Sequence, residues 1–316
     1  MPLRSRESRL RPRTTQDTAV NPNSRAIAAH LIIGSRQEPF LGAALAAIED
    51  AASTLIVNDN SSAPSPHART LEESRFGREG RLIVDRTRFE NFAAARNVCM
   101  RLHADHDAGG WVMYIDADEV HGEAIARIAS RLGEIPAEYG FVDAYMWHFF
   151  QSLEWYTSVD REMMFSRWKP ELHWEGAIHE QLVGLRGRRI ALPYIYAHFS
   201  SVFGPRHFAE KGRHYSSLGA PGEIVPESEL ERIDIAKLYR DYYPQLMRFR
   251  GRLPAAAQAT AAQLCRQLAG EYAQTDAVAR TAPPLQRVRR ALAQVNFEQR
   301  WRLRALNPLA RRLVAP

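Results

Sequence analysis

Short apolar runs that end in polar residues recur along the first 120 residues of the chain. Such runs, bounded by turn-forming side chains, predict strands that are buried on both faces of a parallel sheet. Four of them stand in the order Leu31–Ile33, Leu55–Val57, Leu82–Val84 and Trp111–Ile115, followed in turn by G-S-R (34–36), N-D-N-S-S (58–62), D-R-T-R (85–88) and D-A-D-E (116–119).

Helical spacing separates several of these runs. After Pro39, which suits a first helical position, Leu41, Leu45 and Ile48 fall on one face of a helix. A second helix is expected from Phe89 to His106, closed by the glycines at 109 and 110. Strand, helix, strand in repetition predicts a parallel sheet with helices on both faces. Ligands bind such sheets beyond the carboxyl ends of the strands, where all four polar tips fall.

The tip D-A-D-E carries two carboxylates, Asp116 and Asp118, one residue apart. In an extended strand both would leave the same face. Carboxylates with open coordination positions suit Mg²⁺ or Mn²⁺ holding a diphosphate. The alternatives are that Asp118 caps a helix beginning near Gly122, or that both acids lie in a solvated loop. Asp-X-Asp alone is a weak signal.

In order and spacing, these segments resemble the family-two glycosyltransferases of the GT-A fold. The resemblance covers residues 27–125 and rests on L-I-I-G-S-R-Q-E-P-F-L, T-L-I-V-N-D-N-S-S, R-F-E-N-F-A-A-A-R-N and W-V-M-Y-I-D-A-D-E. It implies an α/β fold with a Rossmann-like, mostly parallel sheet flanked by helices. It also implies a nucleotide-sugar donor, expected to be a UDP-sugar, a Mn²⁺ or Mg²⁺ ion, and inversion at the anomeric carbon. The acceptor would be a saccharide, a lipid-linked molecule or another hydroxyl compound.

Carried over to matching positions, the resemblance assigns donor-binding roles. Ser35 and Asp59 would line the nucleoside pocket, with Arg86 near the base or the phosphates. Asp116 would contact the ribose or a metal-bound water, and Asp118 would bind the metal. The simpler alternatives are that Asp59 is an ordinary turn residue and that Arg86 pairs with a surface acid.

The chain departs from the family pattern at the second strand tip. Asn58 replaces the first acid of the usual Asp-Asp pair, and Asn60-Ser61 replaces Gly-Ser. Recognition of base and ribose through this loop would therefore rest mainly on Asp59.

A later segment, W-K-P-E-L-H-W-E-G-A-I-H-E-Q-L followed by Y-I-Y-A-H-F-S-S, resembles the subgroup that acts in lipopolysaccharide-core and peptide glycosylation. The resemblance places an acid here as the general base. Glu180 is the first choice and Glu175 the reserve, and a charged surface hairpin is the alternative. His198 would complete the metal shell, although a lone histidine among aromatics is more often a core group.

Other groups have weaker claims. Arg96 and Asn97 either contact a substrate or satisfy loop carbonyls, and Lys211 and Arg213 either engage the diphosphate or lie on a solvated helix face. An aromatic group is suited to stacking on an acceptor but equally to a core. Its members are Trp147, His148, Trp155 and Tyr156.

Basic character is concentrated at the two ends of the chain. Residues 1–26 carry +4 and residues 280–316 carry +8, so within a total of +6 the middle carries −6. The N-terminal segment lacks periodicity and is expected to be disordered. Near the C-terminus Leu285, Val288, Leu292 and Val295 recur at helical spacing among arginines. This basic amphipathic helix could dock on the protein itself, on an anionic membrane or on a polyanion.

These features predict four regions: a basic segment (1–26), a nucleotide-sugar-binding half (27–125), an acceptor-binding half (126–220) and a C-terminal helical appendage (221–316). With only two cysteines, Cys99 and Cys265, no run near 18 apolar residues and no signal-peptide core, the expected location is the cytoplasm, with peripheral contact at the inner membrane face.

Two other function classes compete with glycosyl transfer. A sugar-phosphate nucleotidyltransferase would carry a glycine-rich loop after the first strand, where this chain has G-S-R-Q-E-P-F-L. A non-catalytic module of the same fold would use its basic ends to bind nucleic acid or an anionic membrane.

Overall fold

A computed structural model describes residues 26–184, 186–219, 246–304 and 306–316. The expected disordered segment lies outside the described residues except for Ala26, as does residues 221–245 of the C-terminal region. The description that follows concerns the described ranges alone.

The first half of the chain alternates strands and helices as the apolar pattern predicts. The strands β1, β2, β3 and β4 pair side by side in the order β3-β2-β1-β4, and all of these pairs are parallel. The elements are β1 (Ile27–Ile33), α1 (Leu41–Ile48), β2 (Thr54–Asp59), α2 (Ala68–Glu73), α3 (Arg75–Arg78), β3 (Leu82–Asp85), α4 (Phe92–Asp105) and β4 (Trp111–Ile115).

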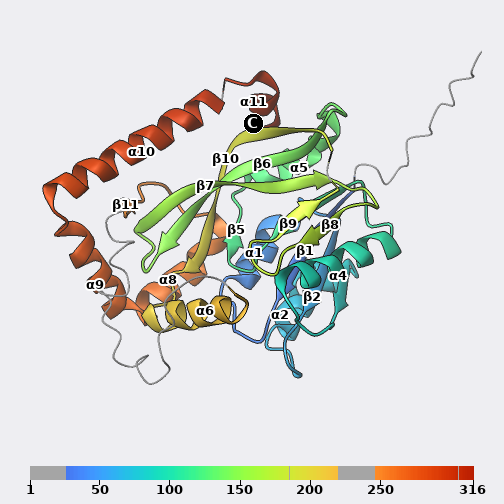
Figure 1. The fold of residues 1–316 in the computed structure, drawn as a ribbon, viewed down its shortest axis with the longest axis horizontal. Coiled ribbons are helices and arrows are strands. Elements are labelled where there is room, and N and C mark those ends of the chain that lie inside the picture. Colours follow the sequence, from blue (N-terminus) through green and yellow to red (C-terminus); the bar gives the residue numbers. More distant parts are fainter. Residues whose placement is uncertain (1–25, 185, 220–245, 305) are drawn as a thin grey trace, which may run out of the picture.

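The second half extends the same sheet with long strands and then turns helical (Figure 1). The nine-stranded sheet has the order β3-β2-β1-β4-β7-β6-β10-β5, with β11 paired to β7. Its elements are β5 (Glu119–Val120), α5 (Ala124–Ser130), η2 (Leu132–Glu134), β6 (Tyr139–Phe150), β7 (Trp155–Arg167), β8 (His173–Glu175), β9 (Gln181–Val183), β10 (Arg188–Ser201), α6 (Pro205–Ser217), β11 (Met247–Arg248), η5 (Ala255–Ala257), α8 (Gln258–Gln267), α9 (Ala269–Arg280), α10 (Pro284–Arg304) and α11 (Pro308–Val314).

All strands of the large sheet except β5 and β7 run in one direction. The antiparallel β7 separates the parallel set β3-β2-β1-β4 from the parallel pair β6 and β10. The expected fold class is therefore confirmed: a mostly parallel α/β sheet flanked by helices, with a helical C-terminal appendage.

Helices cover both faces of the sheet because β1 is apolar on both of its faces. Leu31 and Ile33 join a buried cluster with residues of α1, α5 and α11. Ala28, one residue out of phase, packs with Ile56 and with Cys99 of α4 on the opposite face. The alternation of side chains along a strand thus accounts for a continuous apolar run with two buried sides.

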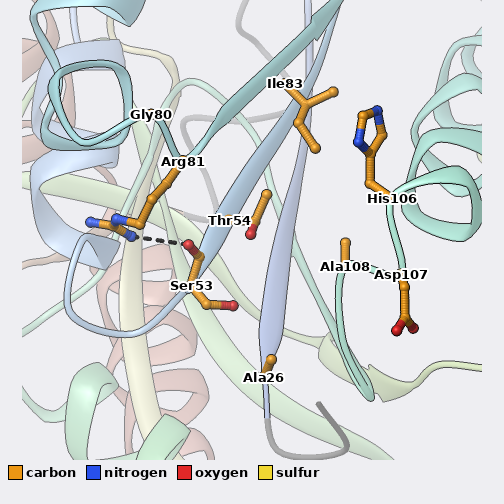
Figure 2. A pocket seen from close by; sticks show the side chains of 9 residues that line it. All are labelled: Ala26, Ser53, Thr54, Gly80, Arg81, Ile83, His106, Asp107 and Ala108. Carbon is orange, nitrogen blue, oxygen red and sulfur yellow. Dashed lines mark hydrogen bonds between the residues drawn. The ribbon is translucent and has the colours of Figure 1, made fainter.

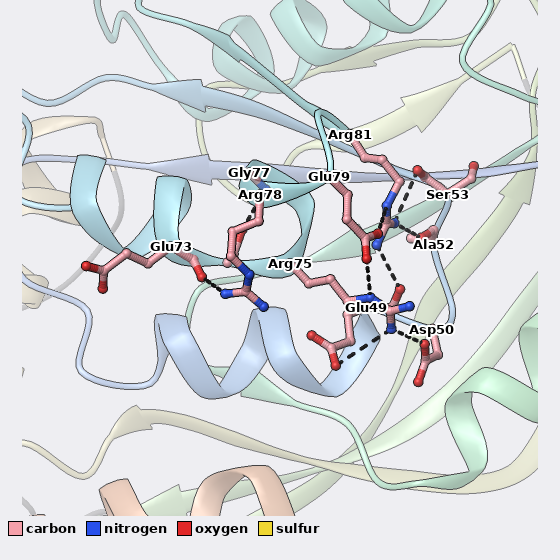
Figure 3. Close-up of polar contacts among 11 residues, drawn as sticks. Glu49, Asp50, Ala52, Ser53, Glu73, Arg75, Gly77, Arg78, Glu79 and Arg81 are labelled. Carbon is pink, nitrogen blue, oxygen red and sulfur yellow. Dashed lines mark hydrogen bonds and ion pairs between the residues drawn. The ribbon is translucent and has the colours of Figure 1, made fainter.

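The segment between β2 and β3 is fixed by a polar network on the surface (Figure 3). Arg75 of α3 binds Asp50 at 2.5 Å, beyond the end of α1, and Glu79 at 2.7 Å. A Cβ atom at Gly77 of α3 would lie 2.4 Å from the carbonyl oxygen of Glu72 in α2, so only glycine fits where α3 meets α2. These contacts hold the helical crossover against the end of α1.

One alternative from the sequence is wrong. Asp118 does not cap a helix, because α5 begins at Ala124 with Glu123 at its N-cap, and the residues directly after Asp118 form β5. Strand β5 pairs antiparallel with β10, which places His198 opposite Glu119. The backbone N–H of Phe199 donates to the carbonyl of Asp118 at 2.9 Å. The Asp-X-Asp tip is therefore held between β4 and β10.

The C-terminal helical region packs against the rest of the protein at both of its ends, through η5 and α8 at the start and through α11 at the end. Ala257, Ala261 and Leu264 join the cluster that contains Phe40 and Phe199, and Ala310 and Leu313 of α11 enter the main core. In the described part of the chain, none of the helices has the length and apolar character needed to cross a bilayer.

Candidate active site

The four predicted polar tips meet at the carboxyl ends of β1, β2, β3 and β4. The backbone N–H of Ser62 donates to Ser35 Oγ at 3.0 Å, which joins the second tip to the first. Asn60 Nδ2 donates to the carbonyl of Thr87 at 2.6 Å, which joins the second tip to the third. Arg36 of the first tip and Asp118 of the fourth both act electrostatically on the carboxyl group of Glu38, which therefore connects these two tips. The tips form one polar site.

Asp59 lies at the end of β2 with its carboxylate buried. Its Oδ1 accepts hydrogen bonds from the N–H and the hydroxyl of Ser61, while its Oδ2 is buried and has no hydrogen-bond partner among the described residues. Burial opposes ionisation, but the hydrogen bonds from Ser61, the nearby Ser65 hydroxyl and the charge of Arg86 outweigh it, so the pKa of Asp59 is lowered. An ionised carboxylate with one unsatisfied oxygen is an acceptor for a ligand hydroxyl or N–H.

The two asparagines that depart from the family pattern have a structural role. Asn58 Nδ2 lies 3.4 Å from Asp85 Oδ1, and Asn60 Nδ2 donates to Asn58 Oδ1 at 2.7 Å. Both amides also reach the carbonyl of Thr87. The substitutions therefore tie the second tip to the third and leave Asp59 as the acid of this loop.

Arg96 of α4 bridges two of the predicted site residues. Its Nε donates to Glu180 Oε1 at 2.5 Å and its Nη2 to Asp116 Oδ1 at 3.1 Å. The guanidinium also lies over the Trp174 ring, 5.1 Å from the centroid. Burial opposes the charge, yet Asp116 and Glu180 raise the pKa of Arg96. The side-chain amide of neighbouring Asn97 instead donates to the carbonyl of Trp174 and accepts a hydrogen bond from the N–H of the same residue.

Asp118 and His198 form the second pair. Asp118 Oδ1 lies 3.4 Å from His198 Nε2, and both side chains are largely buried. Burial alone would raise the pKa of Asp118 and lower that of His198. The mutual attraction of the pair prevails, so the pKa of Asp118 is lowered and that of His198 is raised.

A chain of polar contacts continues outward from His198. Its Nδ1 lies 2.9 Å from His148 Nδ1, and His148 Nε2 lies 3.0 Å from Asp160 Oδ2. Burial lowers the pKa of His148 even though Asp160 favours its charged form. The sequence offered His148 only as part of an aromatic group, and its place behind His198 depends on the pairing of β6 with β10.

Two further acids stand beside the predicted ones and were missed from the sequence. Burial and the charge of Asp118 raise the pKa of Glu38 to about 7. Burial and the charge of Asp116 raise the pKa of Glu119 to about 8. Glu119 Oε2 also accepts the N–H of Asp116 at 3.1 Å. Carboxyl groups so crowded repel one another when ionised, and a divalent cation would relieve that repulsion.

Asp118 and His198 fit a divalent ion whose remaining positions are filled by ligand oxygens. A carboxylate oxygen and an imidazole nitrogen suit Mn²⁺, and their separation lets both reach one ion once His198 loses its proton. Among residues with described positions, no cluster of three or more His, Cys, Asp or Glu side chains is arranged to hold a metal. A two-ligand site leaves coordination positions for phosphate and water.

Helix α6 closes one side of this region. Tyr215 stacks on Phe92 with 5.6 Å between centroids, and Asp116, Asp118 and Glu180 all act on its hydroxyl. Burial and these charges raise the pKa of Tyr215 to about 12. Lys211 on the same helix acts electrostatically on Asp118 and Glu38. The basic run that contains Lys211 is therefore helical, and Lys211 interacts with the carboxylates of Asp118 and Glu38.

The remaining predicted residues are either exposed to solvent or buried in the core. Glu175 is exposed on β8 and pairs with His173 at 3.0 Å. Arg86 is exposed and acts on Asp59, while Asp85 accepts the N–H of Thr87. Trp155 and Tyr156 are buried core residues, so they do not form an acceptor wall.

A hollow of about 520 Å³ lies at the other end of the strands (Figure 2). Small side chains at the amino ends of β1 and β2 line it, and Arg81 turns to the carbonyl of Ser53 at 3.3 Å. The polar tips stand at the opposite, carboxyl ends of the same strands, so this hollow is separate from the site.

No protein-family model and no curated protein matches the chain. Solved structures similar to it include the mannosyltransferase PcManGT from Pyrobaculum calidifontis in complex with GDP-Man and Mn²⁺, 15% identical over 91% of this chain and 82% of that one, with a TM-score of 0.39. TarS 1–349 from S. aureus is 11% identical over 80% and 83%, with a TM-score of 0.35. A mycobacterial protein is 15% identical over 39% and 41%, with a TM-score of 0.28. Likeness this distant carries no functional argument.

Proposed function

We propose that the chain is a metal-dependent, inverting glycosyltransferase that moves a sugar from a nucleoside diphosphate to a hydroxyl acceptor. The observation that carries this proposal is the largely buried pair of Asp118 and His198 at the strand tips, 3.4 Å apart, with Asp116 held nearby by Arg96. A carboxylate and an imidazole so placed suit a divalent cation, and they lie on the same sheet edge as a buried acceptor atom, Asp59 Oδ2.

The donor would lie across the tips of β1 to β4. Asp59 and Ser35 bind the nucleoside, because Asp59 Oδ2 can accept a hydrogen bond from a ribose hydroxyl or a base N–H. Arg86, exposed beside Asp59, would face the base or the phosphates. A uridine diphosphate sugar is the first donor to test, with a hexose or an N-acetylhexosamine as the sugar.

Asp118 and His198 would hold Mn²⁺ or Mg²⁺, with Asp116 reaching a water on the ion or the ribose. When bound, the cation supplies Lewis-acid neutralisation of the departing diphosphate. Lys211 on α6 adds positive charge on the same side. Tyr215 and Phe92, stacked above the acids, help to keep water from the donor.

Glu180 would act as the general base. Arg96 holds its Oε1, which fixes the carboxylate beside Asp116. The acceptor hydroxyl gives its proton to Glu180 as its oxygen bonds to the anomeric carbon, and the bond from that carbon to the diphosphate breaks with inversion. The acceptor is a saccharide, a lipid-linked molecule or another hydroxyl compound. Exposed Glu175, paired with His173, is the reserve.

The test is nucleoside diphosphate release from a panel of sugar nucleotides, with Mn²⁺, with Mg²⁺ and with a chelator. Release with metal and its loss with chelator are expected, because the diphosphate leaves only when its charge is neutralised. Glu180→Gln should lower turnover by about a hundredfold or more, and Glu175→Gln should not. Formation of pyrophosphate from a nucleoside triphosphate and a sugar 1-phosphate instead would identify a nucleotidyltransferase, and no release from any sugar nucleotide would favour a non-catalytic module.

A further inference from the structure

Helix α10 carries a stripe of large aliphatic side chains that point to solvent. Leu285 and Leu292 are each 64% exposed and Leu303 is 65% exposed; Val288 and Val295 are 55% and 52% exposed. These positions recur at helical spacing over 21 residues, a length of about 30 Å. Among the described residues, the exposed large apolar side chains lie on this stripe, at Leu306 just beyond it, and at Val84.

The opposite side of α10 is fixed to the protein, so the stripe is held outward. Arg290 is buried, and its Nη1 donates to the carbonyl of Ala279 at 2.8 Å. Phe297 packs edge-on against Tyr145 of β6 with 6.2 Å between centroids. Beyond the helix, Leu313 of α11 is in the core. Figure 1 shows α10 running along the outside of the molecule between α9 and α11. Within residues 26–184, 186–219, 246–304 and 306–316, the stripe is therefore not docked on the protein itself.

The charges around the stripe are positive. Arg287 and Arg289 are exposed on the first turns of the helix. The sequence from 284 to 304 contains six arginines and a single acid. A polyanion such as nucleic acid would use the arginines but leave the aliphatic stripe in water. A second copy of α10 would bring arginines against arginines.

We propose that α10 lies in the headgroup region of an anionic lipid bilayer, with its aliphatic stripe inserted and its arginines on the lipid phosphates. A helix with a single apolar stripe flanked by cations is suited to the plane of such an interface, where apolar burial and charge attraction add. The proposal does not depend on glycosyl transfer, because it uses none of the residues at the strand tips.

The test is flotation of the full chain with vesicles of phosphatidylcholine, with and without about 30% phosphatidylglycerol. Wild type should float with the anionic vesicles and not with the neutral ones, and salt should weaken binding. Leu285→Gln with Leu292→Gln should lower the partition coefficient by about a hundredfold, since each buried leucine contributes about tenfold. Arg287→Gln with Arg289→Gln should lower it by about tenfold or more.

The matched controls are Val84→Gln, which removes an exposed aliphatic side chain from β3, and Arg69→Gln, which removes an exposed arginine from α2. Both should bind vesicles as wild type does, and circular dichroism should show all variants folded. Equal flotation of wild type and the double leucine variant would overturn the proposal. So would a wild-type dimer that is lost in the leucine variant, because the stripe would then be an interface between copies.

Discussion

Arg96 holds two carboxylates that lie 20 and 84 residues away in the chain. The guanidinium of Arg96 and the carboxylate of Glu180 are mostly shielded from water, so each charge is stabilised mainly by the opposite charge beside it. Arg75 also binds several carboxylates, but it does so on the exposed surface in Figure 3. At the scale of single residues, burial decides how much each arginine contributes.

Arg96→Met should lower the free energy of unfolding by about 3 kcal/mol, because it leaves the mostly shielded Glu180 carboxylate uncompensated. It should also lower turnover strongly, since Glu180 loses its fixed position. Arg75→Met is the control: because its ion pairs are partly exposed, it should lower the free energy of unfolding by at most about 1 kcal/mol and leave turnover unchanged. Urea denaturation and diphosphate release measure the two effects. Equal stability of Arg96→Met and wild type would contradict the account.

Asp59→Asn should raise the donor KM about tenfold and change kcat less. The amide oxygen of asparagine can still accept from Ser61, so the loop stays in place, but the charged acceptor that we propose for the nucleoside is lost. Steady-state kinetics at saturating metal separates the two constants. An unchanged KM would remove Asp59 from the donor pocket.

At the scale of elements, α4 is attached to β1 by a buried histidine pair. His30 Nε2 lies 3.0 Å from His103 Nδ1, and His103 Nε2 lies 2.9 Å from the carbonyl of Gly109. This arrangement needs both rings neutral, with His30 Nδ1 bare and without a hydrogen-bond partner. Burial lowers the pKa of both histidines, and for His30 the charges of His103 and Arg96 add to it.

Because these folded-state pKa values lie below that of an unfolded histidine, the unfolded chain binds more protons in mild acid. Stability from the pair is complete above about pH 6.5 and is lost as the pH falls below it. Between pH 6.5 and 5.5 we expect a loss of about 1 to 2 kcal/mol. Urea denaturation across this range measures it, and His30→Leu should show a shallower dependence than wild type. The same slope in both proteins would contradict this assignment.

Elements with a local signal were predicted well from the sequence. The runs before the tips became β1 to β4, and the helix expected at Phe89–His106 begins at Phe92 because Asn91 caps it by accepting the N–H of Ala94. Glu38 was missed because its proximity to Asp118 depends on the loop after β1, and Glu119, although adjacent to Asp118 in the sequence, was missed because its burial depends on the pairing of β5 with β10. No period in the sequence reports such long-range contacts.

At the scale of the whole molecule, acidic and basic side chains are concentrated in different regions. The strand tips gather carboxylates at one edge of the sheet, while arginines and an exposed aliphatic stripe occupy the C-terminal helix. The sequence predicted both charge regions, because composition along the chain already separates them. The sequence left open which face of α10 packs against the protein. Phe297 and Leu292 are both apolar, and only the contact of Phe297 with Tyr145 of β6 shows which of them faces inward.

The central claim is that the acids at the strand tips bind a divalent cation that in turn binds a diphosphate. Calorimetric titration of UDP and UDP-sugars into the protein tests it directly, with Mn²⁺ and with chelator, for wild type, Asp118→Asn and the surface control Asp50→Asn. The account predicts binding by wild type and Asp50→Asn only when Mn²⁺ is present, and affinity at least about tenfold weaker for Asp118→Asn. Binding that is indifferent to Mn²⁺, or equal in Asp118→Asn and wild type, would contradict it.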